Sequence, residues 1–284
     1  MLAACGRLGF EARTGDAGPG DVGDAAPDAT AVCTNFGPWS APMLAPINSG
    51  STDWGPMLAH GDLSLVFSSD RGGNYDLWLA ERASAAVPFG APAPLLMALG
   101  SQLDPWISAD GLTLFYGNNG ISQVTRPTAG GPWSAPIIVL PASTALYSGS
   151  SGPDFSPDLL HLYFTADRAG GGGQAMWEAT RPTSSSAFGT PVVLDLGIST
   201  DPAFGSARGD GLEVVFQSGG AGADLFASTR AMPSGPFGPA QPLAILDSAA
   251  DEVDGDLSDD GLTVWFALTR AGGWDLYVAT RSCL

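Results

Sequence analysis

Lysine is absent from this chain, and all of its 11 basic residues are arginine. The 29 acidic residues give a net charge of −18, and a surface with this charge repels phosphate backbones. Nucleic acid is therefore not expected as a partner, whereas cations and basic protein surfaces are compatible with the charge. A GC-rich coding bias, which would carry no functional meaning, also accounts for the missing lysine.

Histidine is nearly as scarce, and its two occurrences, His60 and His161, are far apart in the sequence. No Ser-His-Asp arrangement follows from such isolated positions. The glycine run from Gly170 to Gly173 lacks the Lys-Ser/Thr ending of a phosphate-binding loop. No apolar run reaches the roughly 20 residues of a membrane-spanning helix. No window shows a sustained 3.6-residue apolar period, so long helices are not expected.

Glycine and proline are abundant instead, with 39 and 23 residues, and the segments between them are short. Hydrophobic residues make up 44% of the chain, which is enough for a substantial core. Many short strands joined by turns produce such a pattern. The sequence therefore predicts an all-β fold.

A unit of about fifty residues repeats five times along the chain. Its clearest mark is an arginine followed seven residues later by an aromatic residue. The complete pairs are Arg82 with Phe89, Arg126 with Trp133, Arg181 with Phe188 and Arg230 with Phe237. Arg281 has no downstream aromatic, and Trp39 has no upstream arginine of this kind. The two unpaired residues complete each other if the units close into a ring.

Each unit contains the signals of four short strands. A turn such as Asp110-Gly111 precedes an apolar run that ends in an aromatic residue, and a glycine-rich turn follows it. The next strand ends at the repeated arginine, and a proline-bearing strand then suits the sheet edge. Four such strands are typical of a propeller blade. We expect a five-bladed β-propeller closed by an N-terminal outer strand at Trp39, because an open ring would leave exposed edges.

Three of these motifs resemble TolB-type, WD-repeat-like β-propeller repeats. They are the Asp-Gly turns, the stretch from Phe67 to Gly73 and the Asp275 to Arg281 ending, and the resemblance covers residues 36 to 281. The second and fourth units depart from it, because neither has an arginine in the glycine-rich turn. The resemblance implies a propeller fold and a role as a binding or scaffolding module of the bacterial envelope.

The N-terminal segment is expected to lie outside the propeller. Leu2-Ala3-Ala4-Cys5 resembles a lipobox, in which Cys5 would carry lipid, and residues 1–5 would then be the remnant of an export signal that starts further upstream. A chance Ala-Ala-Cys sequence is the alternative. Residues 6–32 are rich in Gly, Ala, Asp and Pro, a composition that cannot bury a core, so we expect an acidic tether. The propeller would then span residues 33–284.

The other two cysteines flank the repeats. In the repeat register, Cys33 and Cys283 both map to the loop that the chain termini interrupt. A disulfide there would replace the missing connection and would require an oxidising compartment, consistent with export. Two free buried thiols are the alternative.

Aspartates before the apolar strands are the remaining candidates for a site. If they surround one mouth of the axial channel, they form a negative site able to hold a hard cation, with tryptophans as apolar walls. The expected ligand-binding residues are Asp53, Trp54, Asp104, Trp106, Asp154, Asp201 and Asp254. The candidate metal ligands are Asp104, Asp154, Asp254 and Asp256. The alternative is that all of these carboxylates are solvated or cap turns.

The sequence leaves the function open between three hypotheses. The first is a non-catalytic binding or scaffold propeller that is lipid-anchored in the periplasm or outer membrane, monomeric and without a cofactor. Its partner would be an envelope protein or a peptidoglycan-associated one. The second is a glycan-active hydrolase with axial carboxylates, which would need unlike acids in one pocket. The third is a structural module stabilised by Ca²⁺.

Overall fold

The computed structural model describes residues 33–59, 61–97, 101–220 and 222–284. Cys5, the expected tether over residues 6–32 and His60 lie outside this part of the chain. Every regular secondary-structure element among the described residues is a β-strand. These residues include no helix long and apolar enough to cross a membrane. The described residues from Cys33 onward form one compact unit.

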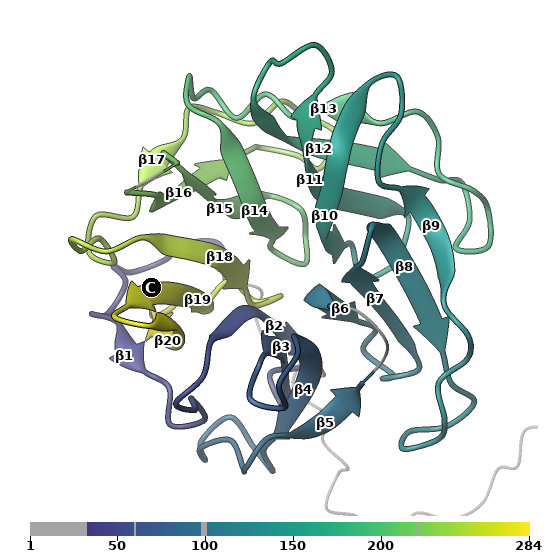
Figure 1. The fold of residues 1–284 in the computed structure, drawn as a ribbon. Coiled ribbons are helices and arrows are strands. Elements are labelled where there is room, and N and C mark those ends of the chain that lie inside the picture. The colour runs from purple at the N-terminus through teal and green to yellow at the C-terminus, as the bar shows by residue number, and fades with distance from the viewer. Residues whose placement is uncertain (1–32, 60, 98–100, 221) are drawn as a thin grey trace, which may run out of the picture. The chain divides into compact units, whose positions relative to one another are not determined.

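Four-stranded antiparallel sheets follow one another along the chain and surround a central axis (Figure 1). The first blade consists of β2 (Asp53–Ala59), β3 (Ser64–Ser69), β4 (Asp76–Glu81) and β5 (Ala93–Leu96). The second consists of β6 (Leu103–Ile107), β7 (Thr113–Gly117), β8 (Gly120–Thr125) and β9 (Ile137–Pro141). The third consists of β10 (Tyr147–Phe155), β11 (His161–Arg168), β12 (Gln174–Thr180) and β13 (Val192–Val193). In each blade the first strand lies nearest the axis.

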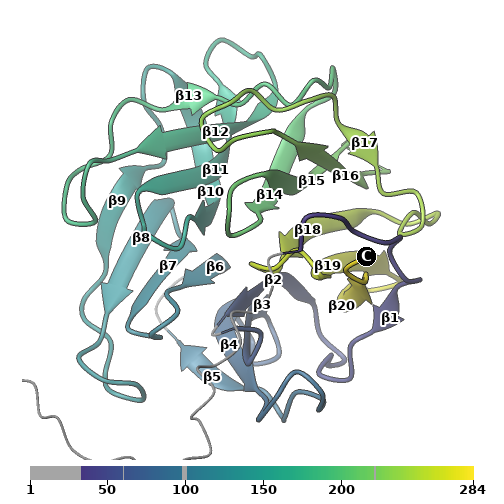
Figure 2. The same ribbon diagram turned by 180° about the vertical axis from the view of Figure 1, so that it is seen from behind.

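The fourth blade is built in the same way, and the fifth takes its outer strand from the other end of the chain. The fourth contains β14 (Pro202–Ala207), β15 (Glu213–Ser218), β16 (Asp224–Thr229) and β17 (Gln241–Pro242). The fifth contains β18 (Glu252–Leu257), β19 (Thr263–Arg270), β20 (Gly273–Thr280) and the N-terminal β1 (Met43–Leu44). Both views of the ring show β1 beside β20 (Figures 1 and 2). The predicted β-propeller and its closure by an N-terminal outer strand are therefore confirmed.

The fourth and fifth blades also touch directly at the axis. A parallel bridge between Gly205 and Gly255 joins β14 to β18. The other three inner strands have proline at the corresponding place, namely Pro56, Pro105 and Pro153. Because proline has no N–H to donate, such a bridge is restricted to the two glycine-bearing strands.

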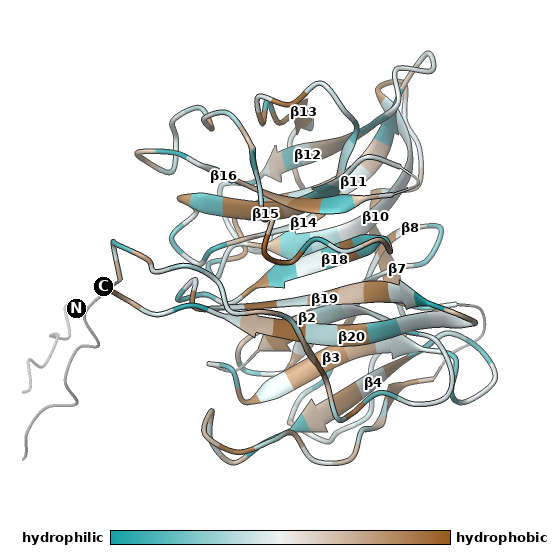
Figure 3. Ribbon diagram, turned by 90° about the vertical axis from the view of Figure 1, so that its left-hand side faces the viewer, coloured by the Kyte–Doolittle hydropathy of each residue, from teal (hydrophilic) through white to brown (hydrophobic). Residues whose placement is uncertain are grey.

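The core lies between the blades rather than on one side of each sheet. The second strand of the first blade, β3, is buried along its whole length. Each of these sheets packs between two neighbours, so both of its faces lose water and a continuous apolar run results. Figure 3 shows brown, hydrophobic segments along the middle strands.

The aspartate turns between the first and second strands are held by their own side chains. The Oδ1 atoms of Asp110, Asp158, Asp210 and Asp260 accept hydrogen bonds from the backbone N–H two residues later, at 2.8–2.9 Å. This is an Asx turn, in which the side-chain oxygen accepts a hydrogen bond from a nearby backbone N–H. These repeated acids therefore have a structural role.

The repeated arginines hold the same turns from the other side. Arg126 donates from Nε to the Gly111 carbonyl at 2.7 Å, and its guanidinium lies 4.4 Å from the Trp133 ring centroid. The same pair of contacts recurs at Arg82, Arg181, Arg230 and Arg281. Each arginine thus ties the end of the third strand to the turn before the second strand.

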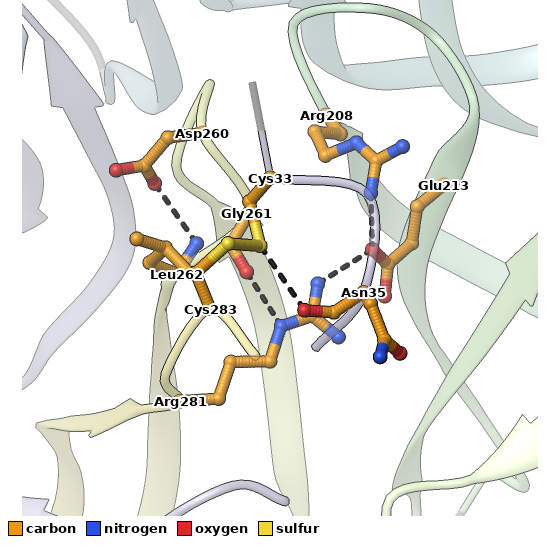
Figure 4. Close-up of a disulfide and its surroundings, with 9 residues drawn as sticks. All are labelled: Cys33, Asn35, Arg208, Glu213, Asp260, Gly261, Leu262, Arg281 and Cys283. Carbon is orange, nitrogen blue, oxygen red and sulfur yellow. Dashed lines mark hydrogen bonds and ion pairs between the residues drawn. A yellow bond between two sulfur atoms is a disulfide. The ribbon is translucent and has the colours of Figure 1, made fainter. Parts of the chain in front are cut away.

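A disulfide closes the ring where the chain ends meet. Cys33 and Cys283 are bonded, with their Cα atoms 5.6 Å apart across 250 positions of sequence, as predicted. Beside them, Glu213 Oε2 accepts from Arg281 Nη2 at 2.6 Å and from Arg208 Nη1 at 3.3 Å (Figure 4). The Phe36 ring lies 3.8 Å from the Arg281 guanidinium and 5.0 Å from that of Arg208. The N-terminal segment is therefore held by a covalent bond and by two arginines.

Candidate functional site

Every inner strand carries a β-bulge where it reaches the axis. The pairing register shifts between Trp54 and Met57 in β2, and at the corresponding place in β6, β10, β14 and β18. A bulge bends its strand and changes the direction of the side chains that follow. In each inner strand, the axial cavity is lined by the three residues that follow the start of the register shift, for example Gly55, Pro56 and Met57.

The first residue of each lining segment forms the mouth of the cavity. Its backbone is left-handed in all five blades, with φ between 42° and 59°. These residues are Gly55, Asp104, Gly152, Phe204 and Asp254. Glycine takes this conformation freely, whereas a phenylalanine or aspartate there costs free energy. Strain of this kind persists where the side chain itself is needed, so the side chains at the mouth are candidates for ligand contact.

Two of the mouth side chains are carboxylates. Burial raises the pKa of Asp104 to about 6, against hydrogen bonds from the Ser151 hydroxyl and the Gly152 N–H. Burial also raises the pKa of Asp254 well above its usual value, and the charge of Asp104 adds to this effect. Asp254 Oδ2 is buried and has no hydrogen-bond partner among the described residues. The mouth therefore holds a carboxylate oxygen that lacks a donor.

A second pair of carboxylates lies one layer deeper, at Asp154 and Asp256. Asp154 Oδ2 accepts from the Ala207 N–H and Asp256 Oδ2 from the Leu58 N–H, both at 2.8 Å. Each bond crosses to the next blade, so both acids join blades together. Burial raises the pKa of Asp154 to about 7 and that of Asp256 well above its usual value. Asp154 is thus poised to hold a proton near neutral pH.

The cavity itself is small and its lining is unequal around the axis. It measures about 50 Å³ at the mouth, and a second cavity of about 60 Å³ continues toward the far end of the inner strands. Both are lined by Met57, Trp106, Asp154, Ser206 and Asp256. Trp106 packs 5.0 Å from Phe155, centroid to centroid, which makes one wall aromatic. The site is an asymmetric pocket and not a ring of equivalent acids.

The remaining residues expected at the axis lie elsewhere. Asp53 is fully buried within the first blade, where it accepts from Arg71 Nη2 at 2.7 Å and from Ser49. Trp54 precedes the bulge and packs 5.7 Å from Tyr75, centroid to centroid. Asp201 lies ahead of β14, and 58% of its side chain is exposed. The bulge starts after these positions, so it does not turn them toward the axis.

In the part of the chain that the structure describes, no three axial carboxylates come close enough to share a metal ion. Among the described residues, the one cluster of three acids with that spacing is Asp224, Asp247 and Glu252, away from the axis. A metal held by Asp104, Asp154, Asp254 or Asp256 stays a prediction.

Sequence reasoning missed three residues of the cavity lining that are neither aspartate nor tryptophan, namely Met57, Phe204 and Ser206. The sequence held a signal for Met57 and Ser206. The inner strands align on a dipeptide whose second residue is proline or glycine, from Gly55-Pro56 to Asp254-Gly255. The residue after this dipeptide faces the cavity in every blade.

Comparisons with known proteins support the fold and leave the activity open. No family model matches the chain, and no curated protein matches it. An α-L-arabinofuranosidase from Podospora anserina is 16% identical, with 87% of this chain and 97% of that chain covered and a TM-score of 0.58. A family 117 glycoside hydrolase from Zobellia galactanivorans is 12% identical, with 87% and 90% covered and a TM-score of 0.55.

A protein described as a TolB from Agrobacterium tumefaciens is also similar in structure. It is 15% identical, with 84% of this chain and 79% of that chain covered and a TM-score of 0.51. At such identities the likeness concerns the fold alone, and both glycoside hydrolases and a TolB protein share it.

Proposed function

We propose that this protein is a non-catalytic binding propeller whose axial mouth takes a cationic group, an amine or a guanidinium, from a ligand or partner protein. The observation that carries this proposal is the buried Oδ2 of Asp254, which lacks a donor beside a second carboxylate, Asp104. A buried unpaired carboxylate is costly, and a cation in the mouth would remove that cost.

The size and charge of the site support the same ligand class. About 50 Å³ is roughly the room of one or two water molecules, since each occupies about 30 Å³ in the liquid. A compact charged tip fits such a space, whereas most small-molecule pockets measure about 300–1,000 Å³. A net charge of −18 would also attract basic partners from a distance.

The cell envelope is the location that we propose for this protein. If Cys5 is lipidated, the anchor joins the propeller through Cys33, whose disulfide lies near Gly261 (Figure 4). The partner would then be an envelope protein or a peptidoglycan-associated one.

A glycan-active hydrolase is the second candidate, and one observation favours it. Asp154 has a pKa of about 7 because it is buried, and a carboxyl that holds a proton near neutral pH is what a general acid needs. Structural neighbours that act on glycans share the fold. Against it, Asp154 and Asp256 already accept backbone hydrogen bonds between blades, and the cavity is too small for a sugar ring.

One pair of measurements separates the two candidates. Calorimetric titration with short arginine- and lysine-containing peptides should show binding that weakens about tenfold or more in Asp254→Asn, while glutamine analogues should not bind. Arabinoxylan and p-nitrophenyl α-L-arabinofuranoside test the alternative. Sugar release that disappears in Asp154→Asn, with no peptide binding, would replace our proposal with the hydrolase.

A further inference from the structure

Three acids meet at the junction of the fourth and fifth blades, away from the axial mouth. Asp224 begins β16, Asp247 lies in the connection after β17, and Glu252 begins β18. Each offers a carboxylate oxygen, and these oxygens lie within 4.8 Å of one another. Three negative charges this close repel strongly unless a proton or a cation lies among them.

Glu252 adds an independent reason to expect a cation. The residue is fully buried, and its Oε1 accepts a hydrogen bond from the Ser248 hydroxyl. Its Oε2 is also buried and has no partner in the described part of the chain. A carboxylate oxygen that is removed from water and receives no donor is costly, and a bound cation would supply the missing interaction.

The equivalent junction between the fifth and first blades shows how the fold normally meets this need. Asp53 stands two residues before the left-handed Gly55, as Glu252 stands two residues before the left-handed Asp254. Ser49 donates to Asp53 from the same relative position that Ser248 holds for Glu252. Asp53, however, is paired with Arg71 Nη2 at 2.7 Å.

The other acid of that junction is neutralised in the same way. Asp275 is the third residue of β20, and its equivalent in the fourth blade is Asp224, the first residue of β16. Each of the two aspartates directly precedes a buried leucine. Arg270 lies 2.7 Å from Asp275, Nε to Oδ2. The place of Asp247 is taken there by the uncharged Asn48, which bonds to the Leu276 backbone. The reference junction thus has two acids and two arginines.

The fourth blade lacks the arginine that this role requires. Arg71 and Arg270 follow the last aromatic of the second strand, Phe67 and Phe266, by four residues. The same position after Phe216 is Gly220. None of the ion pairs found among the described residues involves Asp224, Asp247 or Glu252. Compared with the reference junction, this one has gained an acid and lacks one arginine, at Gly220. The counterpart of Arg71 at this junction is Arg270, which pairs with Asp275 instead.

We propose that Asp224, Asp247 and Glu252 bind a divalent cation of the Ca²⁺ class, which clamps the fourth blade to the fifth. Ca²⁺ takes six to eight oxygen ligands in flexible geometry, so carboxylates from three separate segments suit it, with water completing the shell. The pKa values agree with an uncompensated cluster. Burial raises the pKa of Asp224, with a further contribution from Asp247, and burial raises the pKa of Glu252.

Calorimetric titration of the full chain with Ca²⁺, and separately with Mg²⁺, tests the site. We expect one Ca²⁺ per chain, and a melting temperature that is higher in Ca²⁺ than in EDTA because the ion binds the folded state. Asp247→Asn changes an exposed residue and should fold normally, yet weaken Ca²⁺ about tenfold or more. Glu252→Gln should do the same and melt no lower than the parent in EDTA, because it removes an unpaired buried charge.

Two controls make the result specific. Asp195 is another exposed aspartate in a connection between blades, and Asp195→Asn should leave Ca²⁺ binding unchanged. Asp254→Asn should also leave it unchanged, which separates this site from the axial mouth. The absence of any Ca²⁺ binding at millimolar concentration would overturn the proposal, as would binding that survives Asp247→Asn and Glu252→Gln or that is lost in Asp254→Asn.

Discussion

The Arg281 guanidinium lies 4.4 Å from the ring centroid of Trp39, although the two residues are 242 positions apart in the sequence. In the other blades the same contact joins residues seven positions apart, at 4.3–4.4 Å. The contact therefore has one geometry whether the chain is continuous or interrupted. The closing blade reproduces a complete blade at the level of side chains.

Replacing Arg281 by alanine should destabilise the fold more than replacing Arg126. Both arginines cover an aromatic ring and bond a turn carbonyl, but Arg281 also binds the buried Glu213 at 2.6 Å. Removing one member of a buried ion pair costs about 3–5 kcal/mol when the other charge is left unpaired, whereas a ring contact and one hydrogen bond are worth about 1–3 kcal/mol. Because Arg208 still reaches Glu213 at 3.3 Å, the additional loss in Arg281→Ala should stay below the first range. Urea unfolding of the two variants measures the difference. Equal losses would mean that the contact with Glu213 contributes nothing.

Removing the disulfide should lower stability without changing the fold. The bond closes a loop of 250 residues, and loop entropy then gives at most about 5.5 kcal/mol for Cys33→Ser combined with Cys283→Ser. Denaturant unfolding under non-reducing conditions checks this value, with Cys5→Ser as the control that leaves the bond intact. An unfolding midpoint that matches the control would show that the other closing contacts suffice.

The ring could be predicted from the sequence because its determinants are regular. Trp39, Arg281 and the two cysteines occupy interrupted positions of a pattern that the intact blades define. The position of the cavity depends on something less regular. The dipeptide that carries the bulge varies between inner strands, from Gly-Pro at Gly55 to Phe-Gly at Phe204, and its shared Pro or Gly is too common in this chain to reveal the backbone bend by itself.

The candidate site was accordingly predicted only in part. The expected residues that reach the axis are Asp104, Trp106, Asp154 and Asp254. Asp53 instead points into a blade junction, because it lies two residues before the left-handed position. The acid cluster at Glu252 could not be recognised from sequence, because it joins three segments. The reason to expect a cation there depends on an arginine that is missing at Gly220, and only the structural equivalence with Arg270, the partner of Asp275, shows this absence.

Close backbone approach predicts unequal effects for two equivalent glycines. A Cβ on Gly205 would lie 2.6 Å from the Val215 carbonyl oxygen and 2.7 Å from the Phe216 Cβ, both rigid neighbours. On Gly255 the nearest atoms are side-chain methyls, at 3.0 and 3.1 Å. We expect Gly205→Ala to cost several times more than Gly255→Ala, roughly 2–3 against less than about 1 kcal/mol. Thermal unfolding of both variants measures this, and similar losses would contradict the stated cause.

The axial aspartates predict that stability decreases between pH 4 and pH 7. An unfolded aspartate has a pKa of about 3.9. In the folded protein, burial raises the pKa of Asp104 to about 6 and that of Asp154 to about 7. The folded state therefore binds more protons over this interval, so each such group makes unfolding easier as the pH rises, by up to about 1.4 kcal/mol per pH unit. Urea unfolding at pH 4.5, 6 and 7.5 measures the slope.

Asp154→Asn provides the decisive comparison, because an amide keeps the shape of the group and has no proton to lose. The free energy of unfolding of Asp154→Asn should decrease less steeply with pH than that of the parent. The two stability curves should diverge most between pH 5 and pH 7, because this interval lies between the unfolded pKa of about 3.9 and the folded pKa of about 7. Asp201→Asn, which changes an exposed aspartate outside the cavity, should follow the parent curve. Parallel curves for the parent and Asp154→Asn would show that Asp154 is already ionised at pH 5 in the folded protein. The cavity would then lack the proton on Asp154 that a general acid requires, and the hydrolase alternative would lose its main support.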